Sequence, residues 1–203
     1  MKIFYGAAIQ GARDRGARAY VHQKLINFIK KQGHQVAFDH TRGKSRQDSS
    51  ILLEKKMGPL PATGADRAIP IRQEIIKAVE GDVGAAIFEV STPSLGTGIE
   101  IAHAYLRPKL GLSSIPVLAL YERDFWPNNL SSMLREITPA EIPDFTLQEY
   151  VDLEEAKNYI GEFLQNGTVA EYAFVTKFSY FETNVLNNLC LPATLRQPAK
   201  ATL

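Results

Sequence analysis

The sequence predicts an α/β fold, in which a five-stranded parallel sheet is flanked by helices in a three-layer, Rossmann-like or flavodoxin-like arrangement. Three observations predict it. Short apolar runs alternate with segments of helical spacing, the central runs are apolar throughout like strands buried on both faces, and small-residue loops follow two of them. The chain has 203 residues, of which 45% are hydrophobic and 22% charged, as in an ordinary globular protein.

The elements follow one another in a regular order. Five runs are expected to form strands, at residues 2–5, 35–38, 85–90, 115–121 and 145–150. Helical spacing predicts helices over residues 21–29, 71–80, 99–106 and 129–137, and a last one that opens at Asp152 with Glu155 in a capping box. A polar and basic segment, residues 41–48, leads into a weak helix or a loop.

These elements form one predicted domain over residues 1–165. The remaining segment, residues 166–203, is rich in Phe, Tyr and Leu but has no strong period. It is interpreted as a C-terminal extension, either a helix packed on a partner subunit or a mostly irregular tail.

The composition and charge of the chain limit the kinds of molecule that we expect it to bind. The net charge is +1, which gives no reason to expect a surface for polyanions, and the basic segment after residue 41 lacks interleaved aromatic residues. We therefore expect no nucleic-acid partner.

No apolar run approaches the roughly 20 residues of a membrane span, and Cys190 is the only cysteine. A single cysteine allows no intrachain disulfide, so we expect a reducing, cytoplasmic location. The four histidines lack metal-ligand spacing, so we expect no metal site.

The most informative stretch is residues 89–100, which read as the end of a strand, a loop of small residues and the start of a helix. Ligands of open α/β sheets bind at such crossings. Glu100 is expected in the first helical turn, where a carboxylate either stabilises the helix dipole or serves as an ionised nucleophile. Ser94, Gly96 and Gly98 fit either a flexible turn or a phosphate cradle made of a hydroxyl and backbone N–H groups.

Two further groups are candidates for the same site. The loop from Gly6 to Arg13 ends the first strand and is expected to face the loop before Glu100, although a solvated basic helix start explains it equally well. Glu74 lies on the helix before the third strand and is either a surface carboxylate or a second catalytic group.

The sequence Glu-Val-Ser-Thr-Pro-Ser-Leu-Gly-Thr-Gly-Ile-Glu at residues 89–100 resembles a motif of the nucleoside 2-deoxyribosyltransferase superfamily. It is closest to the branch of 2'-deoxynucleoside 5'-phosphate N-hydrolases. The opening strand and loop, residues 3–11, and the segment Leu-Ser-Ser-Met at residues 130–133 agree with two further motifs of that branch. The resemblance covers roughly residues 1 to 165.

The resemblance implies a role for each matching residue. Glu100 would attack the anomeric carbon of deoxyribose, and Glu74 falls near the family's acid that acts on the leaving base. Ser94 would bind the 5'-phosphate, and Gly96 and Gly98 would let the substrate approach. Substrate contacts are also implied for Tyr5, Ile9, Gly11 and Arg13, and for Ser131 and Met133 of a neighbouring subunit in a homodimer or higher homo-oligomer.

The chain departs from the family at two positions, Ala8 and Gln10, where the branch has a Ser and an Arg that contact phosphate. Either Arg13 compensates or the ligand differs. The sequence thus predicts an N-glycosidase that hydrolyses a (deoxy)nucleoside 5'-monophosphate without a cofactor. Two alternatives are a deoxyribosyltransferase that exchanges bases and a nucleotide-binding sensor that has lost turnover.

Overall fold

Five parallel strands form the sheet of the protein in a computed structural model, which describes residues 1–8, 12–62, 64–123, 125, 130–135, 137 and 140–166. The strands are β1 (Lys2–Ala7), β2 (Gln35–Val36), β3 (Ala85–Glu89), β4 (Val117–Glu122) and β5 (Phe145–Tyr150). Their order in the sheet is β2-β1-β3-β4-β5, and every neighbouring pair is parallel. The predicted fold class and all five predicted strands are confirmed, with ends that differ by at most two residues.

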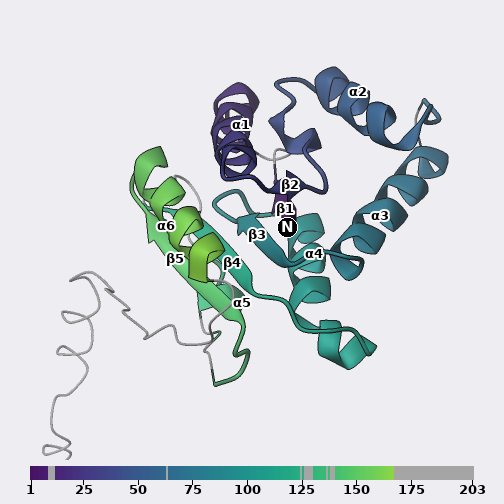
Figure 1. Cartoon of the computed structure of the whole chain (residues 1–203). Helices are drawn as coiled ribbons and strands as arrows, with labels where there is room; N and C mark the ends of the chain where they lie inside the picture. Colours follow the sequence, from purple (N-terminus) through teal and green to yellow (C-terminus); the bar gives the residue numbers. More distant parts are fainter. Residues whose placement is uncertain are drawn as a thin grey trace, which may run out of the picture. The chain divides into compact units, whose positions relative to one another are not determined.

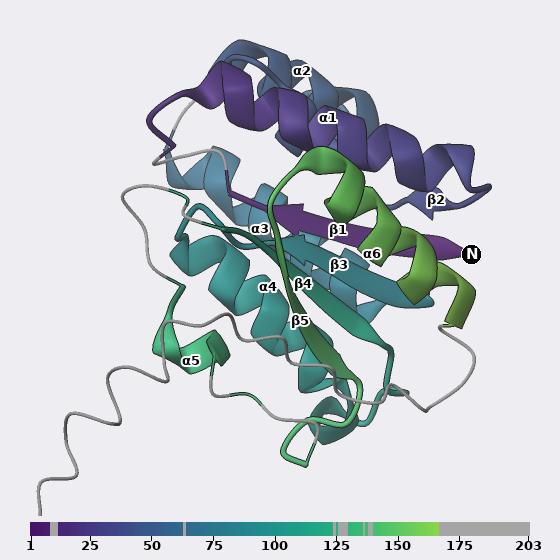
Figure 2. The same cartoon turned by 90° about the vertical axis from the view of Figure 1, so that its left-hand side faces the viewer.

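Helices cover both faces of the sheet (Figure 1). The α-helices are α1 (Arg15–Lys31), α2 (Arg46–Met57), α3 (Ala65–Glu80), α4 (Leu95–Tyr105), α5 (Ser132–Arg135) and α6 (Leu153–Asn166), and the 3₁₀ helices are η1 (His40–Arg42) and η2 (Arg107–Leu110). In Figure 2, α6 lies in front of the sheet, and α3 and α4 lie behind it. The layers match the prediction that parallel strands are buried on both sides.

Two apolar clusters hold these layers together. One joins α1 and α6 to the sheet through Leu25, Ile26 and Ile160. The other joins α2, α3 and α4 to the opposite face through Leu53, Val79 and Ile101. Because side chains alternate along a strand, Tyr5 faces α1 and α6 while its neighbours Phe4 and Gly6 face α3 and α4.

Capping side chains explain where several helices begin. Asp14 accepts a hydrogen bond from the backbone N–H of Ala17 at the start of α1, and Ser45 and Asp48 form a capping box at the start of α2. The weak helix or loop expected after residue 48 is thus a full helix. Gly33, two residues after the end of α1, has a φ of 83°, which suits a glycine just beyond a helix end.

Four predicted helices have different bounds in the structure. The helices expected from residues 21 and 71 each begin six residues earlier, α1 at Arg15 and α3 at Ala65. The helix expected over residues 99–106 begins at Leu95, because Ser94 caps it four residues earlier than the apolar pattern suggests. The helix expected over residues 129–137 is the short α5, and residues 129 and 136 lie outside the described part of the chain.

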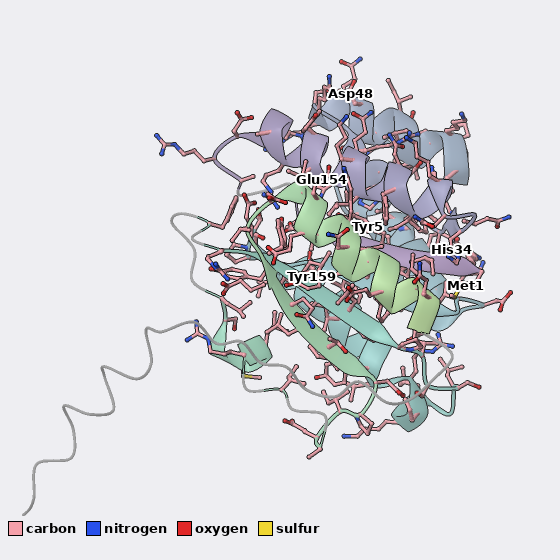
Figure 3. The ribbon with its side chains drawn as sticks, turned by 60° about the vertical axis from the view of Figure 1, so that its left-hand side comes forward. Met1, Tyr5, His34, Asp48, Glu154 and Tyr159 are labelled. Atoms are coloured by element: carbon pink, nitrogen blue, oxygen red, sulfur yellow. The ribbon has the colours of Figure 1, made fainter. Side chains whose placement is uncertain are left out.

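The topology places the switch point of this sheet between β1 and β3. These strands are neighbours, yet the helices that follow them, α1 and α4, cover opposite faces of the sheet. Open α/β sheets bind ligands at such a point, so we expect a ligand-binding crevice, here called the β1–β3 crevice, at the carboxyl ends of these two strands. In Figure 3, Met1 and His34 mark the end of the sheet where the strands begin, and Glu154, at the start of α6, marks the end where they finish.

In the described ranges, no helix is long and apolar enough to cross a membrane. The predicted C-terminal extension lies outside these ranges from residue 167 onwards.

Candidate active site

The turn between β3 and α4 sets the position of the candidate nucleophile. Ser94 is the N-cap of α4, and its Oγ accepts a hydrogen bond from the backbone N–H of Thr97 at 3.4 Å. Glu100 is the sixth residue of the helix and therefore lies in its second turn. The prediction that Glu100 lies in the first turn is wrong, because Ser94 rather than a later residue starts the helix.

This position changes the expected charge of Glu100. The stabilisation of anions by a helix N-terminus is confined to about the first turn, so it acts little on Glu100. Burial raises the pKa of Glu100 to about 7, because the charged carboxylate loses contact with water. The sequence-based expectation of a carboxylate held in its ionised form is corrected accordingly, since near neutral pH the two protonation states are comparably populated.

The Glu100 carboxyl group lies against the end of β1. A Cβ atom added to Gly6 would be 2.8 Å from Oε2 of Glu100 and 2.5 Å from the ring of Phe88. No hydrogen bond or ion pair joins the Glu100 carboxyl group to another described residue. A partly buried acid near the β1–β3 switch point, without a protein partner among the described residues, is a candidate functional group.

Two glycines in the first turns of α4 leave the backbone uncovered. A Cβ on Gly98 would meet no atom within 4 Å, and a Cβ on Gly96 would meet only Oγ of Ser94, at 3.5 Å. Glycine costs a helix about 1 kcal/mol relative to alanine, and no packing contact explains the choice at either position. The bare backbone leaves space for close approach of a ligand to the N-terminus of α4.

The structure describes only part of the loop between β1 and α1. Ile9, Gln10 and Gly11 lie outside the described residues, whereas Ala8 is buried. Arg13 is exposed and lines a cavity of about 760 Å³ together with Arg15, Arg18, Glu122 and Phe125. The cavity lies between the start of α1 and the end of β4, so this loop does border open space at the carboxyl edge of the sheet.

Tyr5 is not brought together with Glu100. Its side chain is 1% exposed, on the face of the sheet covered by α1 and α6, and its hydroxyl is hydrogen-bonded to Nδ1 of His22 at 3.0 Å. Tyr5 is labelled in Figure 3. Burial raises the pKa of Tyr5 and lowers that of His22 to about 4, so both side chains are neutral at pH 7.

Glu74 and the short α5 lie apart from these contacts. The Glu74 side chain is 43% exposed and accepts a hydrogen bond from Lys77 at 3.4 Å. No hydrogen bond among the described residues joins it to Glu100. Ser131 is exposed at the start of α5, where its Oγ accepts from the N–H of Met133 at 3.3 Å, and Met133 is 81% exposed.

Sequence reasoning missed a buried polar network at the same edge of the sheet. Glu89, at the end of β3, forms an ion pair with Arg18 and hydrogen bonds with Ser91 and Tyr150. Arg18 also pairs with Glu122, at the end of β4. A signal was available, because Glu89 is a charged residue that directly ends an otherwise apolar strand.

The fold and site together define an α/β protein with an isolated acid and an open helix N-terminus at the switch point of its sheet. In the described ranges, no group of three or more His, Cys, Asp or Glu side chains is placed to hold a metal ion. A search with protein-family models finds no match.

Two curated proteins are similar to the chain. "Putative 2'-deoxynucleoside 5'-phosphate N-hydrolase 1" of Thermofilum pendens is 35% identical over 156 residues, which are 77% of this chain and 90% of that protein. The protein of the same name from Methanococcoides burtonii is 26% identical over 142 residues, 70% of this chain and 95% of that protein. The chain belongs to the 2'-deoxynucleoside 5'-phosphate N-hydrolase family, a branch of the nucleoside 2-deoxyribosyltransferase superfamily, which confirms the predicted family and its enzymatic class.

Proposed function

We propose that the protein hydrolyses the bond between base and sugar in a 2'-deoxynucleoside 5'-monophosphate, releasing the free base and 2-deoxyribose 5-phosphate. The names of both curated relatives support this substrate class. The observation that carries the proposal is the position of Glu100, a partly buried acid without a partner among the described residues, set against Gly6 in the β1–β3 crevice.

Glu100 acts as the nucleophile in this proposal. Its ionised carboxylate attacks C1' of the deoxyribose, the C1'–N bond breaks, and the base leaves with the bonding electron pair. Water then attacks C1' of the glycosyl-enzyme, which releases the sugar phosphate and restores the carboxylate. Carboxyl groups of the protein and water suffice for both steps, so the proposal needs no cofactor.

The N-terminus of α4 binds the 5'-phosphate. Backbone N–H groups and the positive end of the helix dipole favour an anion there, and Gly96 and Gly98 allow it to approach closely. The Ser94 hydroxyl uses a lone pair to accept from Thr97, which leaves its own hydrogen to donate to a phosphate oxygen. Arg13 supplies positive charge from the opposite loop, where Ala8 and Gln10 have replaced the family's phosphate-binding Ser and Arg.

The leaving base needs a proton, and Glu74 remains our proposal for the group that assists it. The family resemblance supports this role, and the exposure of the Glu74 side chain leaves it accessible to a ligand. Its bond to Lys77 is a surface pair of small energetic weight, about 0 to 1 kcal/mol, so substrate can displace it.

A second copy of the chain completes the site in this proposal. Ser131 of that copy contacts the phosphate and Met133 approaches the base. The exposure of Met133, 81%, supports a contact that this single chain does not supply. The active assembly is therefore a homodimer or a higher homo-oligomer.

The test is release of free base, measured by chromatography, from the four 2'-deoxynucleoside monophosphates, their nucleosides and the ribonucleotides. We expect release from at least one deoxynucleotide, little from nucleosides, and a loss of about 10³-fold or more in Glu100→Gln. Glu154→Gln, a matched substitution on the surface of α6, keeps the wild-type rate. A Glu100→Gln variant as fast as the wild type refutes the nucleophile.

The same assay separates the alternatives. A foreign free base added to the reaction is incorporated into a new nucleotide only if the enzyme transfers deoxyribose. If the wild type releases no base but nucleotides raise its melting temperature, the protein is a sensor and the proposed hydrolysis is wrong.

A further inference from the structure

Glu89 is the first residue of the motif that ends at Glu100, and the proposed reaction gives it no task. It is fully buried at the end of β3, five residues before the Ser94 cap. An acid at such a position needs partners, because an unpaired buried charge is strongly destabilising.

Both oxygens of the Glu89 carboxylate are occupied. Oε2 lies 2.6 Å from Nη2 of Arg18, a side chain that is 5% exposed. Oε1 accepts hydrogen bonds from the Tyr150 hydroxyl at 3.1 Å and from the Ser91 backbone N–H at 3.3 Å, and also from the Ser91 hydroxyl. These partners come from α1, from β5 and from the turn that follows β3.

Ser91 links the same turn to the next strand. Its Oγ accepts a hydrogen bond from the backbone N–H of Glu122 at 2.8 Å while its own hydrogen goes to Glu89. Glu122 in turn pairs with Arg18, whose guanidinium lies 4.5 Å from the centre of the Phe125 ring. The first residues of the turn are thereby fixed to β4, β5 and α1.

The network combines the charged pair of Arg18 and Glu89 with two neutral hydroxyl donors. Burial by itself would raise the pKa of Glu89, but Arg18, His22 and the Ser91 hydrogen bond outweigh it and hold the pKa below its ordinary value. Burial and the adjacent Glu89 charge raise the pKa of Tyr150, so its hydroxyl stays a donor. Buried ion pairs contribute little net stability compared with apolar packing, so stability alone does not account for this arrangement.

We propose that Glu89, Ser91 and Tyr150 are positioning residues, whose hydrogen bonds hold the turn after β3 so that Ser94 and Glu100 meet the substrate in reactive geometry. This inference rests on the proposed function. A displacement of about 1 Å in a reacting group costs up to about 100-fold in rate, which makes rigid support of this turn consequential.

Three variants test the proposal. Tyr150→Phe and Ser91→Ala each remove hydroxyl contacts of Glu89 and keep the Arg18–Glu89 ion pair. Tyr159→Phe is the matched control, because it removes a Tyr–Glu hydrogen bond of 3.0 Å, to Glu155, within α6. Each variant is compared with the wild type in kcat, KM, the pH dependence of kcat/KM and the melting temperature.

We expect kcat to fall about tenfold or more in Tyr150→Phe and Ser91→Ala, with KM less affected, and to stay within about twofold in Tyr159→Phe. If the turn is loosened, water reaches the Glu100 carboxyl group and lowers its pKa. The acid limb of the kcat/KM profile should therefore move to lower pH in Tyr150→Phe and Ser91→Ala, but not in Tyr159→Phe. If their melting temperatures fall while kcat and the acid limb stay unchanged, the network is merely structural and the proposal is overturned.

A second measurement keeps the two proposals separate. The Glu100 carboxyl group is titrated by ¹³C NMR, with Glu100→Gln identifying its signal. If the wild type cleaves no nucleotide, the proposed function fails, but a lower Glu100 pKa in Tyr150→Phe and Ser91→Ala than in Tyr159→Phe still supports the positioning role. An unchanged Glu100 pKa in all three variants, together with unchanged kcat in an active enzyme, overturns it.

Discussion

Gly6, at the end of β1, and Glu100, in the second turn of α4, meet so closely that a Cβ on Gly6 would lie 2.8 Å from the Glu100 carboxyl oxygen. The nearest side chain on the same side is Phe88, the register partner of Gly6 on β3. The absence of a side chain at one strand residue therefore creates the space that the proposed nucleophile occupies.

Gly6→Ala should abolish this fit. The added methyl group would collide with Phe88 and Glu100, and overpacking of this kind costs about 1–3 kcal/mol. We expect a lower urea midpoint and a loss of base release of about 100-fold, since the carboxylate is pushed from its place. Gly161→Ala is the control: its Cβ would meet Phe28 at an ordinary 3.7 Å, and the helix should gain stability with unchanged activity.

Gly98→Ala should separate stability from activity. Nothing lies within 4 Å of the added Cβ, so the helix should gain about 0.5–1 kcal/mol in urea unfolding. The methyl group would cover backbone that the proposal reserves for the phosphate, so KM for the nucleotide should rise about tenfold. A variant that is more stable and equally active would contradict the phosphate site.

The stability of the protein should fall as the pH rises from about 4.5 to about 7 because of Glu100. Its carboxyl group has a pKa of about 7 when folded and 4.5 as the reference for the unfolded chain, so in this interval the folded state binds more protons. Glu100→Gln does not titrate. It should therefore exceed the wild type in unfolding free energy by up to about 3 kcal/mol at pH 8, with the difference shrinking toward pH 4.5. Urea unfolding at both pH values, with Glu154→Gln as a control, measures it.

The rate of base release should rise with pH through about 7. The nucleophile must be ionised, and burial raises the pKa of Glu100 to about 7. The acid limb of kcat/KM should therefore lie well above the range of an ordinary glutamate. A limb near pH 4.5 would contradict the enclosed carboxyl group.

Mixed oligomers should test whether two chains build one site. Glu100→Gln removes the nucleophile, and Ser131→Asp places a negative charge where the proposal puts the phosphate. Each variant alone should be nearly inactive, yet dissociating and mixing them should restore activity, because one site of a mixed dimer receives an intact Glu100 and an intact Ser131. No recovery, despite mixed oligomers detected by mass spectrometry, would place Ser131 outside the partner's site.

The sequence by itself determined the layered fold and led to the candidate site. Apolar runs such as residues 85–90 and helical spacing such as residues 21–29 depend on local periodicity, which a single sequence displays directly. The motif that ends at Glu100 led to the family for the same reason, because its residues are contiguous.

Only the tertiary structure decided the electrostatics of the site. The pKa of Glu100 depends on burial against β1, a strand more than 90 residues away in the sequence, and the network around Glu89 joins α1, β4 and β5. The sequence pattern misplaced the start of α4, because the Ser94 cap outweighs the low helix propensity of Gly96 and Gly98. Charge and reactivity arise from contacts between distant segments, and only packing of the sheet and its helices brings those segments together.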